Sequence, residues 1–173
     1  VRMKTICDYH KRPVETLVWN EEQPVDPRLV ASKLSEDASI THVAVVHCET
    51  TTGILNPIKD IAEVVKEAKR ALLIDSMSAF GALDVSAKSI PFDALVASSN
   101  KCLEGSPGMG FCLADKSALL KTEGNADSLC FDLLEQWKGL EANGRWRFTP
   151  PTHCILAFHQ ALVEFDEEGG VQG

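Results

Sequence analysis

The sequence predicts an α/β protein with a mainly parallel central sheet and helices on both faces. Three apolar runs support this prediction, at residues 41–48, 71–75 and 94–97, and each has the length of a buried strand. A helical pattern separates the first two runs, and strands that alternate with helices indicate βαβ units. Polar residues follow all three runs directly. We therefore expect one polar edge of the sheet, where open α/β sheets bind their ligands.

The segment before the first run contains two further strand candidates and one helix. Residues 3–7 form a short apolar-containing segment, and residues 14–19 alternate between apolar and polar side chains, as strands do. Asp26-Pro27 has the pattern of a helix start, with Asp as the N-cap and Pro in the first helical position. We expect this helix to continue to about Leu34.

The remaining elements follow from similar signals. Asn56-Pro57 is expected to open the helix that joins the first two runs, since apolar residues then recur at helical spacing. Residues 129–140 fit a helix and an extended segment equally well. The other expected elements are a strand at 110–114, a short helix that Asp115 caps and that ends at Leu120, an extended segment at 146–151 and an amphipathic helix at 152–168.

Composition limits the classes of function. The chain has 173 residues, enough for one domain with a sizeable core. Its net charge of −8 disfavours nucleic-acid binding, which usually requires a basic face. No apolar run approaches the roughly 20 residues of a membrane span, and the start of the chain lacks the apolar block of a secretory signal. We therefore predict neither a nucleic acid nor a membrane as a partner.

The cysteines indicate a reducing compartment. None of the six forms a C-x-x-C pair, and most lie within apolar runs. This pattern is typical of reduced core thiols, and we expect a cytoplasmic protein. A structural zinc site needs tighter clustering of Cys and His than the chain offers, so no metal is predicted.

Lys101 is the first candidate for chemistry. It comes shortly after the third apolar run, between small polar residues and a glycine-rich turn. Desolvation in such a place can favour the neutral, nucleophilic form of a lysine amine. Taken alone, however, this stretch favours an ordinary solvated lysine in a loop.

The ends of the other two runs strengthen the case. Thr50 follows the first run and Asp75 ends the second, so both are expected at the same sheet edge as Lys101. Each has a structural explanation, because threonines often satisfy backbone groups and aspartates often occupy turns. Together, a lysine and a nearby carboxylate are what pyridoxal phosphate requires. The lysine holds its aldehyde as a Schiff base, and the carboxylate keeps the pyridine nitrogen protonated.

The order and spacing of these residues resemble a known family. The segments DSMS, which begins at Asp75, and SSNK, which ends at Lys101, are similar to those of the fold-type I, class V pyridoxal phosphate aminotransferases. Residues 47–57 (HCETTTGILNP) and 148–153 (FTPPTH) resemble, within that family, the aminotransferases that act on 2-aminoethylphosphonate and pyruvate. The resemblance covers essentially all of the chain.

The resemblance implies a role for each site residue. Lys101 and Asp75 would be catalytic: Lys101 forms the Schiff base and then moves the proton of the substrate carbon, while Asp75 binds the pyridine nitrogen. Hydroxyl and amide donors suit the other oxygens of the cofactor. The cofactor-binding residues implied, beside these two, are Thr50 near the ring's 3-oxygen, Met77 on the ring face, and Ser98 and Asn100 by the phosphate. Thr149 would reach the cofactor of the partner subunit across a dimer interface. Thr152, which lies nearby in the sequence, is an alternative to Thr149 for this role.

The resemblance also implies the activity and the extent of the domain. The reaction would transfer the amino group of 2-aminoethylphosphonate to pyruvate, giving phosphonoacetaldehyde and L-alanine, in phosphonate degradation by a homodimer with shared active sites. Residues 1–173 would be the central portion of the cofactor-binding large domain. The family's phosphate loop would precede Val1, and its small domain, with the substrate-binding arginine, would follow Gly173. Arg145 and Arg147 are expected to be solvated charges instead.

Alternatives remain open on the residues alone. One is a class V aminotransferase with another amino donor, of the alanine–glyoxylate or serine type. Another is a catalytically silent fragment that binds no cofactor, since half of the expected site lies outside the chain. The 173 residues alone are expected to bind pyridoxal phosphate weakly and to turn over little. A cysteine desulfurase is disfavoured, because Asn100 stands where that group has a histidine before its lysine. The histidines at 47, 153 and 159 are expected to be structural.

Overall fold

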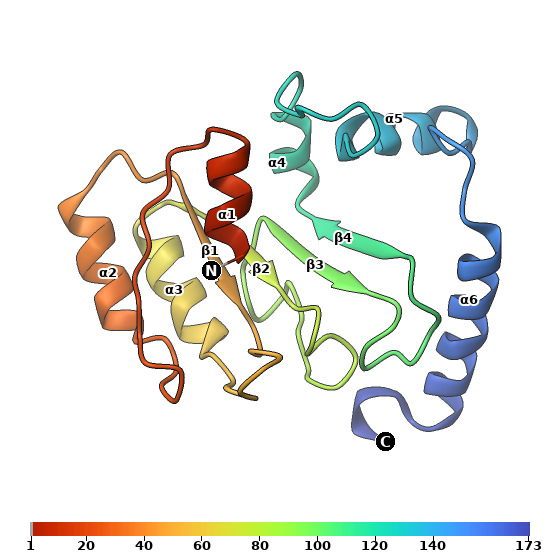
Figure 1. Ribbon diagram of the computed structural model, residues 1–173, viewed down its shortest axis with the longest axis horizontal. Coiled ribbons are helices and arrows are strands. Elements are labelled where there is room, and N and C mark those ends of the chain that lie inside the picture. The colour runs from red at the N-terminus through yellow and green to blue at the C-terminus, as the bar shows by residue number, and fades with distance from the viewer. Residues whose placement is uncertain (1) are drawn as a thin grey trace.

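A four-stranded sheet organises the computed structural model, which describes residues 2–173 (Figure 1). The first three strands are parallel to one another, and the fourth runs antiparallel to the third. The strands, in their order across the sheet, are β1 (His42–Val46), β2 (Ala71–Asp75), β3 (Ala94–Ser98) and β4 (Gly110–Ala114). The prediction of a mainly parallel α/β sheet is confirmed, and the three apolar runs form its parallel part.

The helices begin mostly where the sequence predicts. Asp26 caps the first predicted helix by accepting a hydrogen bond from the Arg28 amide at 2.9 Å, and Asp115 accepts one from the Ala118 amide at 2.8 Å. Residues 129–140, which the sequence does not decide, lead into a helix that Asp132 caps. The helices are α1 (Arg2–Tyr9), α2 (Pro27–Glu36), α3 (Ile58–Glu67), α4 (Lys116–Leu120), α5 (Leu133–Asn143), α6 (Thr152–Glu167) and the 3₁₀ turn η1 (Gly170–Gln172).

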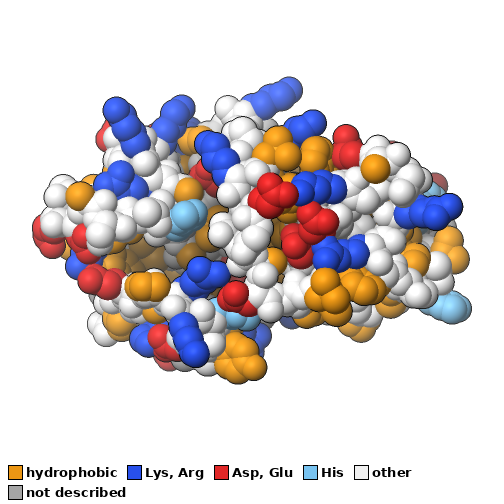
Figure 2. Space-filling model, turned by 90° about the horizontal axis from the view of Figure 1, so that it is seen from above, with side chains coloured by type: hydrophobic (Ala, Val, Ile, Leu, Met, Phe, Trp, Pro, Cys, Tyr) orange, Lys and Arg blue, Asp and Glu red, His pale blue; other side chains and the backbone are white. Residues whose placement is uncertain are grey.

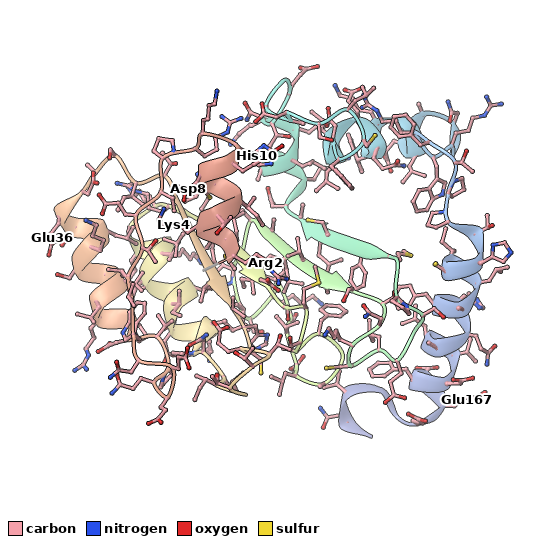
Figure 3. The ribbon with its side chains drawn as sticks, viewed as in Figure 1. Arg2, Lys4, Asp8, His10, Glu36 and Glu167 are labelled. Carbon is pink, nitrogen blue, oxygen red and sulfur yellow. The ribbon has the colours of Figure 1, made fainter. Side chains whose placement is uncertain are left out.

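Both strand predictions near the start of the chain are wrong. Residues 3–7 lie within α1, where Lys4 and Asp8 form an ion pair of 2.5 Å one turn apart (Figure 3). Residues 14–19 are irregular, and Val18 is 84% exposed. A strand needs a neighbour for its backbone hydrogen bonds, and neither segment joins the described sheet.

The core lies between one face of the sheet and the pair α2 and α3. Alternate strand residues point to this face, as the period of two in a strand requires. The largest fully buried apolar side chains are Ile61 and Val65 from α3, together with Leu72, Ile74 and Leu95 from the sheet. This packing holds β1, β2 and β3 in register and therefore sets where their carboxyl ends lie.

The other face of the sheet is partly exposed. Leu73 alternates with the buried Leu72 and Ile74 but is 38% exposed, and its register partner Ala44 is also exposed. Within residues 2–173, the helical members of this core cluster come from α2 and α3, whereas Leu134 of α5 and Ala161 of α6 are buried outside it and α1 buries none of its residues. The helices of this core cluster therefore pack on one face of the sheet, and the other face is partly exposed.

The surface carries charged side chains of both signs. Lysine, arginine and acidic side chains are intermixed on the face that Figure 2 shows. No helix among residues 2–173 is long and apolar enough to cross a membrane.

The six cysteines are free thiols, but Cys130 is exposed and the other five are only half-buried. The expectation that these thiols lie in the core was therefore wrong.

Candidate active site

The carboxyl ends of β1, β2 and β3 meet at one edge of the sheet, the lower edge in Figure 1. The register pairs Val46 with Asp75, and Asp75 with Val96, so the parallel strands end almost level. The loops that follow them carry Thr50, the turn after Asp75, and Lys101. The predicted polar edge is therefore present, and it brings these three segments to one place.

Asp75 is the last residue of β2 and is half-buried. Its Oδ1 accepts a hydrogen bond from the backbone amide of Met77 at 3.0 Å, which fixes the carboxylate relative to the turn. Its Oδ2 makes no hydrogen bond within residues 2–173. The turn role expected of an aspartate is thus met by one oxygen, and the other remains available to a ligand.

Ser78 connects the three loops, and sequence reasoning did not find it. Its hydroxyl is hydrogen-bonded to the hydroxyl of Thr50, and its carbonyl accepts a hydrogen bond from the Cys102 thiol at 3.4 Å. One residue of the turn after Asp75 therefore contacts both the Thr50 loop and the Lys101 loop. The sequence feature that could have identified Ser78 is its position three residues after Asp75, in the same segment at the end of the strand.

Lys101 lies in the turn that follows β3 and is exposed, as is Asn100. Ser98 is the last residue of β3 and is half-buried. The desolvation that the sequence suggests for Lys101 is therefore not provided by residues 2–173. What the chain does provide is a compact loop, residues 99–109, that returns directly into β4.

Thr149 does not join the other candidate residues. It is exposed and lies in the segment between α5 and α6, at the upper right of Figure 1 and away from the strand-end loops. In the same segment, the side chain of Arg147 is 22% exposed and faces Asp132 and Glu135, each at 3.8 Å. The expectation of a solvated Arg147 was wrong, because two carboxylates from α5 and its cap draw the guanidinium inward.

His47 lies beneath the site edge with only 4% of its surface exposed. Its Nδ1 is hydrogen-bonded to the hydroxyl of Ser76 at 3.1 Å, and its backbone amide donates to the carbonyl of Asp75 at 2.7 Å. Burial lowers the pKa of His47 because the charged imidazolium loses its hydration. His47 thus joins the first residues of the loops that follow β1 and β2, in agreement with a structural role. His153 and His159, in contrast, are exposed on α6.

The buried His47 is expected to make the free energy of unfolding depend on pH. The unfolded chain binds a proton at this histidine near pH 6.5, whereas the folded chain does so only at lower pH, so stability falls as the pH decreases below about 6.5. Urea unfolding at a series of values between about pH 7 and pH 5 measures this slope. His47→Asn, which cannot titrate, should show a shallower slope; parallel curves for the two proteins would contradict the assignment.

The chemistry available at this edge is that of an amine, a carboxylate, several hydroxyls and an amide. A lysine amine can condense with an aldehyde, and a carboxylate can stabilise a protonated ring nitrogen. Hydroxyl and amide groups can bind phosphate oxygens. Among residues 2–173, no group of three or more His, Cys, Asp and Glu is placed to hold a metal ion.

The fold is that of the fold-type I aminotransferases. A solved pyridoxamine–pyruvate aminotransferase from Mesorhizobium loti superposes with a TM-score of 0.85 at 27% identity, over 98% of this chain and 45% of that one. An alanine–glyoxylate aminotransferase from Nostoc has the same TM-score at 21% identity, over 97% of this chain and 45% of its own, and shows the fold alone.

The chain belongs, more specifically, to the class V aminotransferase family, whose model matches residues 1–172. A relative from Pseudomonas putida, named 2-aminoethylphosphonate–pyruvate transaminase, is 52% identical over 170 residues, which are 98% of this chain and 46% of the relative. A Burkholderia lata relative, named 2-aminoethylphosphonate–pyruvate transaminase 2, is 48% identical over 98% of this chain and 45% of its own. The chain therefore spans about half the length of these relatives.

Proposed function

We propose that the protein transfers the amino group of 2-aminoethylphosphonate to pyruvate, giving phosphonoacetaldehyde and L-alanine. The observation that carries this proposal is the junction at Ser78, which ties together the loops of Thr50, Asp75 and Lys101 at one sheet edge. The choice of substrates rests on the names of relatives that are 48% to 52% identical over nearly the whole chain.

The residues at this edge fit pyridoxal phosphate as the cofactor. The cofactor needs a carboxylate and an amine from the protein, and the free Oδ2 of Asp75 and the exposed amine of Lys101 would supply them. Neither group makes a hydrogen bond or an ion pair within residues 2–173. When bound, pyridoxal phosphate supplies an aldehyde that condenses with amines and a ring that accepts electrons. Lys101 would hold it covalently through Nζ.

Lys101 and Asp75 would divide the catalytic work. After the substrate amine displaces it, the Nζ of Lys101 would move a proton from the amine-bearing carbon of the donor to the aldehyde-derived carbon of the cofactor. It would move a proton in the opposite direction during the amination of pyruvate. The carboxylate of Asp75 would face the pyridine nitrogen and stabilise its positive charge. The hydrogen bond from the Met77 amide keeps this carboxylate in place without neutralising it.

The other candidate residues would bind and orient the cofactor. Thr50, held by Ser78, would donate a hydrogen bond near the 3-oxygen of the ring, and the half-buried Met77 would cover one ring face. Ser98 and Asn100 would contact the phosphate with a hydroxyl and an amide. These contacts would exclude water from one side of the site.

The rest of the site would come from outside these residues. The open sheet face at Leu73 and the exposure of Lys101 support the proposal that residues 1–173 are the central portion of a larger cofactor-binding domain. Thr149, exposed and apart from the strand-end loops, is free to reach the cofactor of a second subunit in a homodimer. Six free thiols favour a cytoplasmic protein.

The amino donor is tested by following the visible absorption of the bound cofactor. We expect 2-aminoethylphosphonate to bleach this band and to yield phosphonoacetaldehyde, and pyruvate to restore the band with formation of L-alanine. Bleaching by L-serine but not by 2-aminoethylphosphonate would indicate another class V donor specificity. The absence of this band would support the second candidate, a catalytically silent chain that binds no cofactor, which the exposure of Lys101 favours.

A further inference from the structure

The loop that carries Lys101 is closed by a buried serine, Ser99. This residue has no exposed surface, and its hydroxyl donates to the carbonyl of Ser106 at 2.7 Å, with the carbonyl of Met109 at 3.3 Å. Both acceptors lie on the returning half of the loop. The side chain of Ser99 therefore bridges the two halves, two positions before the lysine.

The backbone of Ser99 reinforces this closure. Its amide donates to the carbonyl of Met109 at 3.1 Å, and its carbonyl accepts from the amide of Gly105 at 2.7 Å. A Cβ on Gly105 would lie 2.8 Å from the Ser99 carbonyl oxygen and 3.2 Å from the ring of Phe158 on α6. Since a contact of 2.8 Å is too short, residue 105 must be glycine for the loop to close in this way.

The far side of Lys101 is held by different contacts. Leu103 is 3% exposed and packs so closely on Gly81 that a Cβ there would lie 2.8 Å from its Cδ2. Cys102 donates to the carbonyl of Ser78. The backbone of Lys101 is thus anchored on both sides, although its own side chain is exposed.

We propose that Ser99 is a positioning residue for Lys101: its buried hydroxyl closes the loop and so holds the lysine amine where the cofactor aldehyde binds. This inference rests on the proposed function, in which Lys101 holds pyridoxal phosphate. Without the hydroxyl, the carbonyl of Ser106 loses a part-buried hydrogen bond and the loop opens more readily. The amine of Lys101 then samples more positions, and a smaller fraction of these positions lies within reach of the cofactor.

Two controls separate positioning from general stability. Ser106→Ala removes an exposed side chain but leaves the carbonyl that Ser99 uses, so it should behave like the wild type. Ser76→Ala removes an equally buried hydroxyl, bonded to His47 and outside the Lys101 loop. It should lower overall stability without loosening residues 99–109.

The test combines amide hydrogen exchange of the full chain with titration of the protein by pyridoxal phosphate. In Ser99→Ala, we expect residues 99–109 to exchange roughly tenfold faster and the cofactor dissociation constant, read from the visible band, to rise roughly tenfold. If Ser99→Ala folds poorly, Gly105→Ala loosens the same contact by displacing the Ser99 carbonyl, and the same two changes are expected.

Two results would overturn the inference. One is loop exchange that Ser99→Ala leaves unchanged. The other is an equal loss of the visible band in Ser99→Ala and Ser76→Ala, which would reduce the effect of Ser99 to general destabilisation. A visible band that survives in Lys101→Ala would instead contradict the proposed function, while the exchange data would still report on the loop.

Discussion

Lys101→Ala is expected to lower the rate of amino transfer by more than about a thousandfold, because in the proposed function this one side chain would serve both as the covalent attachment and as the proton carrier. The visible band of the bound cofactor should disappear with it. Folding should be unaffected, since Lys101 is exposed and its side chain makes no hydrogen bond or ion pair within residues 2–173.

Absorbance spectra and steady-state rates measure this effect, with thermal unfolding as the test of folding. Lys88→Ala is the matched control, because Lys88 is also an exposed loop lysine but lies before β3 rather than after it. It should retain both the band and the activity. A Lys101→Ala protein that keeps its visible band would show that another amine holds the cofactor.

Asp75→Asn is expected to lower the rate by about a hundredfold or more, the loss typical of removing one stabilising group from a developing charge. The amide oxygen of asparagine can still accept the hydrogen bond from Met77, so the turn after β2 should persist. Only the negative charge is lost. In the proposed function, the pyridine nitrogen of the cofactor would then no longer be held protonated, and the ring would accept electrons less well.

Asp93→Asn is the matched control for this experiment. Asp93 is also half-buried and also accepts from a backbone amide, that of Leu72 at 2.8 Å, but it lies at the amino end of the strands. Steady-state rates should therefore be much lower for Asp75→Asn than for Asp93→Asn, whereas the unfolding curves of the two variants should be similar. Equal activity of Asp75→Asn and Asp93→Asn would remove Asp75 from the catalytic residues.

Local signals predicted the sheet and most helix starts because each of these signals acts over a few residues. Apolar runs become buried strands, and Asp26 and Asp115 cap the helices that follow them. The same reasoning failed at residues 3–7 and 14–19, where the composition fits a strand but no neighbouring strand is present. Strand formation depends on a partner that a local pattern cannot supply.

The candidate site divides in a similar way. Thr50, Asp75 and Lys101 could be proposed from sequence because each follows a predicted strand, and parallel strands end at the same edge. Ser78 and Ser99 could not, since a hydroxyl near a strand end has no distinctive pattern. Their importance lies in contacts with other loops and with the returning half of one loop.

The order of apolar runs and polar strand ends was therefore enough to determine the α/β class and the residue types at the site edge. Periodicity and capping are properties of neighbours in the chain, and the sequence contains them completely. The tertiary structure alone decided that Ser78 joins three loops, that Ser99 closes the loop of Lys101, and that one sheet face stays open. These features depend on distances between segments far apart in sequence, which only the packed sheet and its helices define.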